Sequence, residues 1–220
     1  MVTKVRQLRR EELDTVLEWA AAEGWNPGVH DAETFWAADP DGFLGLEADG
    51  RLIGSISLVT YGRHYGFAGL FIVRPEFRGQ GIGSFGVENL LAKFRSRLDR
   101  NATIAIDGVF EMQSYYASLG MNFNHRNIRM AGVGTANPAA RAACHALSGV
   151  PFAETVAYDT AHFGAPRPAF LHPWIHQSGA LSVAALDDGQ LTGYGVVRPC
   201  REGYKIGPLF AADGGIAEVL

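Results

Sequence analysis

Cysteine is scarce in this chain, and its two cysteines, Cys144 and Cys200, are isolated in 220 residues. Two such residues do not make a disulfide framework, and in a chain without an export signal we expect free thiols, with one disulfide as the alternative. His172 and His176 are four residues apart, but no further ligand accompanies them. We therefore expect no metal site.

Long apolar runs and an excess of positive charge are also absent. No stretch approaches the ~18–20 apolar residues of a membrane span, and the first segment, MVTKVRQLRREELD, lacks the apolar core of a secretory signal. Lysine and arginine total 19 against 23 aspartates and glutamates, a net charge of −4. This net negative charge argues against nucleic acid or an anionic membrane as the main partner. We expect a cytoplasmic protein.

Glycine, by contrast, is abundant, and it is concentrated in the segment IVRPEFRGQGIGSFG, residues 72–86. An apolar run ends near Pro75, and Gly79, Gly81 and Gly83 then precede a helical pattern. The first N–H groups of a helix lack partners and attract anions, and glycines let a ligand approach them closely. The segment predicts a phosphate or pyrophosphate site, although its spacing is neither that of a Walker loop nor that of a Rossmann loop.

The pattern of apolar residues predicts an α/β protein with a mixed sheet flanked by helices. Expected strands cover 5–8, 43–47, 51–61, 67–73, 103–106 and 127–132, and expected helices cover 10–22, 31–38, 81–97 and 112–119. Asp49-Gly50 suits a tight hairpin turn between two of these strands.

The run from Arg78 to Gly83 resembles the R/Q-x-x-G-x-G/A loop of the GNAT N-acetyltransferases, which lies between a strand and a long helix. Arg78, Gly81 and Gly83 carry the match, and the order of elements over about residues 3–133 also agrees. The resemblance implies a GNAT fold with a central mixed β-sheet and acetyl-CoA as cosubstrate. The alternative is a glycine turn that serves helix packing and binds nothing.

The resemblance also implies residue roles. Backbone groups of Phe71, Ile72 and Val73 would bind the pantetheine arm of the cofactor. The amides expected to hold its pyrophosphate belong to Arg78, Gly79, Gln80, Gly81, Ile82, Gly83 and Ser84. GNAT domains often dimerise, so a monomer and a homodimer both stay open.

A second landmark of the family, Y-x-x-L-G-F, resembles YYASLGM and matches on Tyr116. In the family this tyrosine often protonates the leaving thiolate, and a phenol with a pKa of ~10 is suited to that role. Core packing is the alternative role for Tyr116, and Tyr115 is a possible substitute. Val109 departs from the pattern, because many members have asparagine there.

The acceptor amine must lose a proton, and Asp107 is the first candidate to bind or deprotonate it. Asp107 could instead cap the turn at Gly108, and His64 is a second candidate base. The acceptor should lie near the break between the first two helices, where Trp25, Asn26 and His30 could line it or serve the core.

From about residue 135 alanine, glycine and proline become frequent and the apolar periodicity weakens. We therefore predict one domain over 1–134 and a second over 135–220, which begins with a helix over 139–147. DGRLIG at 49–54 resembles DGQLTG at 188–193, and YGFAGLF at 65–71 resembles GYKIGPLF at 203–210. The repeat resembles the degenerate second GNAT-like domain of some bacterial members. It shows no counterpart to residues 90–133, so it is either a half-length repeat or part of a longer chain.

The second domain is not expected to bind coenzyme A, because residues 211–215, AADGG, stand where Arg-Gly-x-Gly should be. The loop arginine is missing there, and Asp213 would repel phosphate. We expect it to close the acceptor side, with Trp174, Arg167 and Tyr204 as contributors.

These observations predict an N-acetyltransferase that moves an acetyl group from acetyl-CoA to a small-molecule amine, with Tyr116 as general acid. A protein lysine or N-terminal acetyltransferase and a non-catalytic acyl-CoA-binding module are the alternatives. A purely structural interaction protein would have no affinity for coenzyme A.

Overall fold

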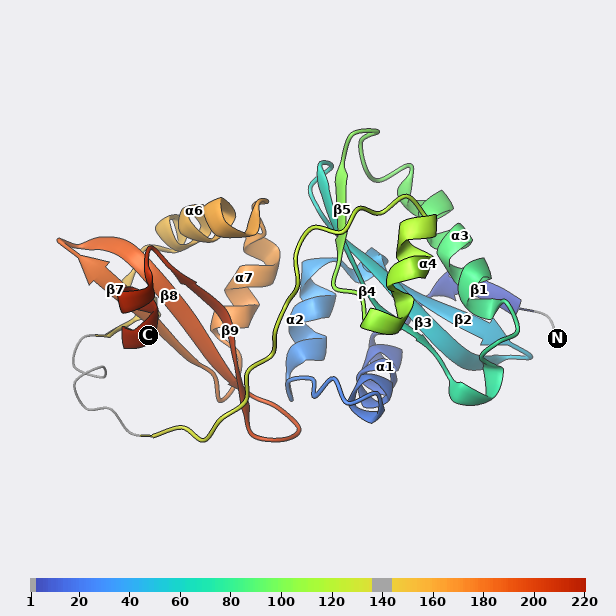
Figure 1. Cartoon of the computed structure of the whole chain (residues 1–220), viewed down its shortest axis with the longest axis horizontal. Helices are drawn as coiled ribbons and strands as arrows, with labels where there is room; N and C mark the ends of the chain where they lie inside the picture. The colour runs from blue at the N-terminus through green and yellow to red at the C-terminus, as the bar shows by residue number, and fades with distance from the viewer. Residues whose placement is uncertain (1–2, 136–143) are drawn as a thin grey trace.

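A computed structural model describes residues 3–135 and 144–220 and contains two β-sheets (Figure 1). The first sheet has the order β1-β2-β3-β4-β5, and every neighbouring pair is antiparallel except β4 and β5, which are parallel. Its strands are β1 (Thr3–Gln7), β2 (Phe43–Ala48), β3 (Arg51–Tyr61), β4 (Tyr65–Val73) and β5 (Thr103–Ile106). The expected mixed sheet is confirmed.

Helices cover both faces of this sheet, because alternate residues along a strand point to opposite sides. Phe43 packs with α1 (Arg10–Ala22) and α2 (Asp31–Ala38), whereas its neighbour Leu44 packs under α3 (Ile82–Phe94). A short helix, α4 (Gln113–Ser118), follows β5. Three 3₁₀ turns complete the domain: η1 (Pro40–Gly42), η2 (Pro75–Phe77) and η3 (Phe110–Met112).

One expected strand is absent. Residues 121–135 contain no regular structure, so the strand predicted over 127–132 is wrong. The chain leaves the sheet after α4 and runs toward the second sheet (Figure 1), so its backbone does not pair with β5. The long helix is also shorter than the predicted 81–97, since α3 ends at Phe94 and a turn follows.

The second sheet is antiparallel, with the order β6-β7-β8-β9. Its strands are β6 (His145–Ala146), β7 (Leu181–Asp187), β8 (Gln190–Pro199) and β9 (Tyr204–Ala211). A 3₁₀ turn, η4 (Leu147–Gly149), and the helices α6 (Phe152–Phe163), α7 (Pro168–Ile175) and α8 (Gly214–Val219) accompany it. The helix predicted over 139–147 lies mostly outside the described residues, and its described end is strand and turn.

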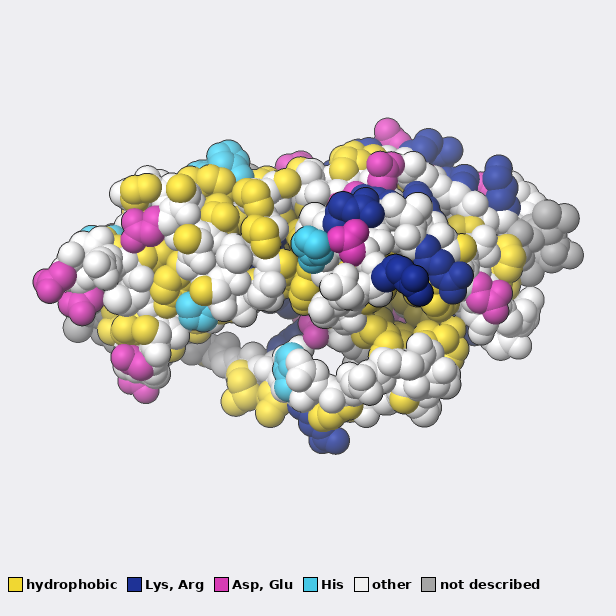
Figure 2. Space-filling model, turned by 90° about the horizontal axis from the view of Figure 1, so that it is seen from above, with side chains coloured by type: hydrophobic (Ala, Val, Ile, Leu, Met, Phe, Trp, Pro, Cys, Tyr) yellow, Lys and Arg dark blue, Asp and Glu magenta, His cyan; other side chains and the backbone are white. Residues whose placement is uncertain are grey.

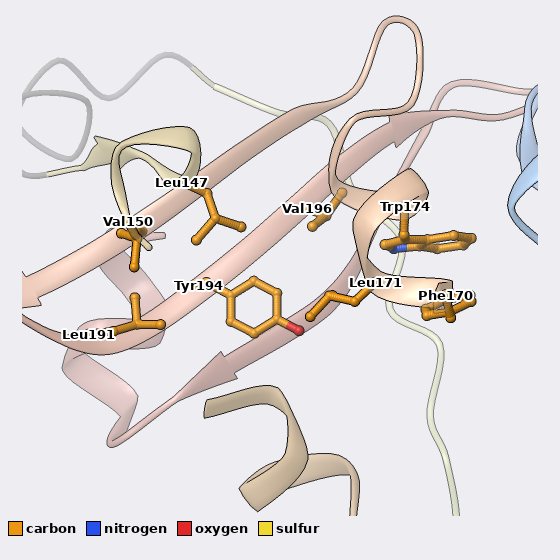
Figure 3. Packing of buried hydrophobic residues seen from close by; sticks show 9 residues of the cluster. Leu147, Val150, Phe170, Leu171, Trp174, Leu191, Tyr194 and Val196 are labelled. Atoms are coloured by element: carbon orange, nitrogen blue, oxygen red, sulfur yellow. The ribbon is translucent and has the colours of Figure 1, made fainter. Parts of the chain in front are cut away.

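A compact apolar core holds α7 against the second sheet. Figure 3 shows the side chains of Leu147, Val150, Phe170, Leu171, Trp174, Leu191, Tyr194 and Val196 gathered in this core. Tyr194 is fully buried, and its hydroxyl donates a hydrogen bond to Asp159, which also forms a buried ion pair with Arg167.

The repeat read from the sequence has a structural counterpart. Asp49-Gly50 and Asp188-Gly189 all have positive φ, between 48° and 79°, as a tight hairpin turn requires. The turns join β2 to β3 and β7 to β8, and a third antiparallel strand follows in each sheet. The division at residue 134 stays a prediction, since the connecting chain includes residues that are not described.

The two domains contact each other through α2 and α7. Phe35 stacks on Trp174 at a centroid distance of 6.0 Å. Gly28, in the loop between α1 and α2, pairs with Cys200 in an antiparallel bridge. The second domain therefore holds the α1–α2 loop directly.

Candidate functional site

The parallel strands β4 and β5 form a fork. They pair only from Tyr65 to Ala68 on β4. Beyond Ala68, β4 continues to Val73 paired with β3 but not with β5. At the point of divergence the pairing of β3 with β4 shifts by one residue, and Leu70 has a φ of +45°. The Ser55 hydroxyl donates to the Leu70 carbonyl at 2.7 Å and supports this bulge. Beyond it, no strand of the described residues pairs with β4 on the β5 side.

The direction of these peptide groups follows from one hydrogen bond. The Arg74 N–H donates to Ile53 on β3, and peptide groups alternate sides along a strand. The groups of Phe71 and Val73 therefore turn toward the fork, and those of Ile72 turn toward β3. Of the three residues predicted to bind the pantetheine arm, Phe71 keeps both peptide groups for that role, whereas Val73 keeps its N–H, because its carbonyl accepts from Arg78.

A glycine loop follows the open part of β4. Gly79 and Gly81 have φ values of +73° and +76°, and a Cβ at either would meet nothing within 4 Å. Gly81 immediately precedes α3, whose first turn has no acidic residue and no side-chain cap. The amides of Ile82, Gly83 and Ser84 thus have no partner among the described residues, and they offer the donors that an anion requires.

Contacts around the loop involve three of its residues, Gly83, Arg78 and Gln80. A Cβ on Gly83 would lie 3.0 Å from the Phe71 ring, so glycine lets α3 approach β4 closely. Arg78 donates from Nε to the Val73 carbonyl at 2.7 Å, and its Nη2 pairs with Glu23 at the end of α1. The Gln80 side chain bonds the Glu76 carbonyl at 3.2 Å.

Tyr116 lies on α4 against the end of β5. A Cβ at Gly108 would come within 2.5 Å of its ring, so the phenol packs directly on this glycine. Burial raises the pKa of the half-buried Tyr116, and Tyr115 raises it further. Tyr115 packs against the core under α3. The two tyrosines therefore have different surroundings: Tyr116 packs on Gly108 and Tyr115 packs on the core.

Asp107 directly follows β5 and is exposed. Its Oδ1 accepts a hydrogen bond from the Asn127 side chain at 2.7 Å. Ile104 and Ile106 pack under α3, so the alternation of the strand puts Asp107 on the opposite face, toward α1 and α2. His64, the second candidate base, precedes Tyr65 at the far end of β4 and contacts Asp99 at 3.1 Å.

The α1–α2 loop is bound by the second domain. The Asn26 side chain exchanges two hydrogen bonds with the backbone of Glu202, at 2.9 and 3.0 Å. The Trp25 carbonyl accepts from Lys205 at 2.7 Å. Asn26, predicted to line the acceptor site, thus has a contact between domains, while Trp25 and His30 are half-buried.

A buried ion pair anchors the same loop. Arg198 contacts Asp31 through two hydrogen bonds of 2.8 and 3.0 Å, and Asp31 also accepts from the Gly28 N–H at 2.8 Å. The Arg198 guanidinium lies 4.2 Å from the Trp174 ring.

The three residues of the second domain that were predicted to close the acceptor side differ in burial. Trp174 and Arg167 are buried in its interior, whereas Tyr204 is exposed. The rings of His172 and His176 lie 4.7 Å apart, and no group of three potential metal ligands occurs within residues 3–135 and 144–220. Both cysteines are free thiols.

Sequence reasoning missed Glu23, Asn127, Arg129 and Lys205, which contact Arg78, Asp107 and the Trp25 carbonyl. No motif in the sequence marks these residues, because each reaches the site through a contact between distant segments.

The chain matches two models of one known protein family. The family model described as "Acetyltransferase (GNAT) family" matches residues 5–121, and "Acetyltransferase (GNAT) domain" matches residues 155–220. The chain belongs to the GNAT family. It is an acyl-CoA-dependent N-acetyltransferase with a second GNAT-like domain, and its cosubstrate is acetyl-CoA.

Relatives match both domains. Holothin acyltransferase of a Pseudoalteromonas species is 27% identical over 96% of this chain and 70% of that protein. YitH of Bacillus subtilis, an uncharacterized N-acetyltransferase, is 25% identical over 99% of this chain and 76% of its own length. The structure of a putative acetyltransferase from Pyrococcus horikoshii has a TM-score of 0.75 at 20% identity, covering 99% of this chain and 74% of that one.

No helix within the described part of the chain is long and apolar enough to cross a bilayer.

Proposed function

We propose that this GNAT enzyme acetylates the primary amine of a small molecule, with Tyr116 as general acid. The observation that carries the proposal is the position of the phenol. Tyr116 lies against Gly108, just after β5, on the β5 side of the fork, and the peptide groups of Phe71 and the N–H of Val73 line its β4 side. A thioester in the fork would lie between an oxyanion-binding strand and a proton donor.

The proposed reaction is direct transfer. The neutral amine attacks the thioester carbonyl, a C–N bond forms, and the C–S bond breaks. An N–H group of Phe71 or Val73 stabilises the carbonyl oxygen during the attack. The sulfur leaves with the proton of the Tyr116 hydroxyl, and Asp107 or water takes the proton that the amine releases. A raised Tyr116 pKa keeps the phenol protonated at neutral pH.

Two observations support a small acceptor. The α1–α2 loop, which borders the acceptor side, is covered by the β8–β9 turn of the second domain. A long peptide would have to displace these contacts. The relative matched over 96% of the chain is named for acyl transfer to holothin, a single named acceptor.

The first test is thermal stability with acetyl-CoA, coenzyme A, ATP and NAD in parallel. A ligand at 100 times its dissociation constant stabilises a fold by ~2.7 kcal/mol, and we expect stabilisation by the two coenzyme A compounds alone. No shift with either would overturn the assignment of the loop.

The second test separates an enzyme from a binding module. Tyr116→Phe should lower kcat by about 100-fold or more and leave acetyl-CoA binding intact, whereas Tyr115→Phe should have little effect on turnover. Equal turnover of Tyr116→Phe and wild type, with an amine that the wild type acetylates, would remove Tyr116 from the mechanism. Faster acetylation of lysine peptides than of free amines would favour the protein-directed alternative.

A further inference from the structure

The segment over residues 121–135, here called the strap, crosses from the first domain to the second without regular structure. Figure 1 shows it passing in front of α2 between the two sheets, and Figure 2, seen from above, shows an opening between this segment and the body of the molecule. Large apolar side chains of the strap are exposed, Ile128 at 80% and Met130 at 86%. The strap is therefore held by polar contacts.

Polar contacts of the strap reach the end of β5 and the α1–α2 loop. Asn127 donates to Asp107 at 2.7 Å, and the Arg129 guanidinium lies 3.5 Å from the Trp25 carbonyl. Two residues before Trp25, Glu23 pairs with Arg78 in the glycine loop. Consecutive Cα atoms are 3.8 Å apart, so each two-residue step spans at most about 7.6 Å. The strap and the α1–α2 loop thus frame the mouth of the fork between Asp107 and the glycine loop.

Two positively charged side chains next to the α1–α2 loop, Lys205 on β9 and Arg129 on the strap, have no acidic partner among the described residues. Lys205 and Arg129 both point to the Trp25 carbonyl, at 2.7 and 3.5 Å. Neither forms a salt bridge with any residue that the structure describes. Asp31, whose charge also acts on Lys205, already pairs with Arg198. Burial lowers the pKa of Lys205, and Arg129 lowers it further. An anion at this position would relieve the repulsion and the lost hydration.

We propose that the acceptor carries an anionic group, a carboxylate or a phosphate, and that Lys205 and Arg129 bind this group while the amine lies toward Asp107. Asn127 and Arg129 are separated by one residue, so the two ends of such an acceptor lie several ångströms apart along the strap. The inference rests on the proposed function, because it assumes an amine acceptor in the same fork. It assigns the second domain a direct part in choosing the acceptor, through Lys205 on β9.

Coenzyme A also carries phosphates, and one of them is a second possible occupant of the Lys205–Arg129 site. The two sources differ in which Michaelis constant responds. An acceptor anion at this site makes the KM of the acceptor sensitive to Lys205. If a cofactor phosphate occupies the site, the KM of acetyl-CoA depends on Lys205 instead. The KM of a dephospho analogue of acetyl-CoA then changes less when Lys205 is replaced.

The test compares matched amines on the wild-type enzyme. The probes are amino acids against the corresponding amino-acid amides, and phosphoethanolamine against ethanolamine, each at saturating acetyl-CoA with thiol release as the readout. We expect kcat/KM to be at least about 10-fold higher for the anionic member of a productive pair, the range of one charge-assisted hydrogen bond.

Variants then separate charge from structure. Lys205→Gln keeps a donor for the Trp25 carbonyl but removes the charge, and Lys205→Arg restores the charge. We expect Lys205→Gln to raise the KM of anionic acceptors by about 10-fold, with unchanged kcat and unchanged KM for acetyl-CoA, and Lys205→Arg to recover most of the loss. Lys4→Gln removes a lysine charge from β1 and should change neither constant.

Each result either supports the anionic acceptor or overturns it. Equal kcat/KM for anionic and neutral amines, or an equal loss for both in Lys205→Gln, would overturn the anionic acceptor while leaving amine acetylation intact. A rise in the KM of acetyl-CoA alone would assign the two cations to the cofactor and also overturn the proposal. If a wider panel of neutral, anionic and peptide amines gave no acetylation at all, the proposed function itself would fall.

Discussion

The Tyr116 ring lies on the backbone of Gly108, so closely that a Cβ at residue 108 would be 2.5 Å from its Cε2 atom and 2.7 Å from its Cδ2 atom. Gly108 immediately follows Asp107, the candidate base. One contact therefore sets the distance between the proposed proton donor and the end of β5.

Replacement of Gly108 by alanine should move the phenol without removing it. We expect Gly108→Ala to lower kcat by about 100-fold, because a displacement of about 1 Å can cost that much. The KM for acetyl-CoA should change little. Gly149→Ala is a matched control, since a Cβ there meets nothing within 4 Å. Unchanged kcat in Gly108→Ala would show that the position of Tyr116 does not limit the reaction.

An acidic residue in the glycine loop should abolish cofactor binding. Gly81→Asp puts a negative charge beside the free amides of α3 and a side chain on a residue with φ of +76°. We expect loss of the stabilisation by acetyl-CoA in a thermal melt. Gly62→Asp introduces the same charge at a residue with φ of +66° in the β3–β4 turn. If Gly62→Asp lost acetyl-CoA binding equally, backbone strain rather than the loop would explain the effect.

The buried pair Asp31–Arg198 should hold the two domains together. Asp31 is 2% exposed and Arg198 8% exposed, and removal of one partner leaves a buried charge uncompensated. We expect Arg198→Met to lower the free energy of unfolding by about 3–5 kcal/mol, measured in urea. The double variant Asp31→Asn with Arg198→Met should lose less than the sum of the single changes, and strict additivity would contradict a direct coupling.

Stability in acid should depend on Glu12. Hydrogen bonds from Arg6 lower the Glu12 pKa from 4.5 to about 2. A carboxylate with a depressed pKa stabilises the fold above its unfolded pKa, and that contribution disappears as the pH falls from 4.5 toward 2. Glu12→Gln should therefore cost about 2 kcal/mol at pH 7 and progressively less below pH 4.5.

The matched control for this prediction is Glu11→Gln, which lies on the exposed side of the same helical turn. It should follow the wild-type curve of unfolding free energy against pH. A cost of Glu12→Gln that stayed constant from pH 7 to pH 2 would point to lost packing instead of lost charge.

Local features of both domains were predictable because short-range chemistry determines them. Asp49-Gly50 and Asp188-Gly189 adopt the positive φ of a tight hairpin turn, and Gly79 and Gly81 adopt positive φ in the loop before α3. Apolar periodicity located α1, α2 and the paired strands for the same reason. Tyr116 was found through its motif, and the contact with Gly108 further distinguishes its surroundings from those of Tyr115.

Tertiary structure decided the rest, because the deciding contacts join residues that are far apart in the chain. The segment over residues 127–132 has the composition of a strand, yet it became part of the strap, since the chain must cross to the second sheet. Asn127 reaches Asp107 over 20 residues, and Lys205 reaches Trp25 over 180. No local pattern encodes such pairs. The sequence by itself determined the glycine loop that we propose binds the cofactor, and the packing of two domains decided which charges surround the proposed acceptor site.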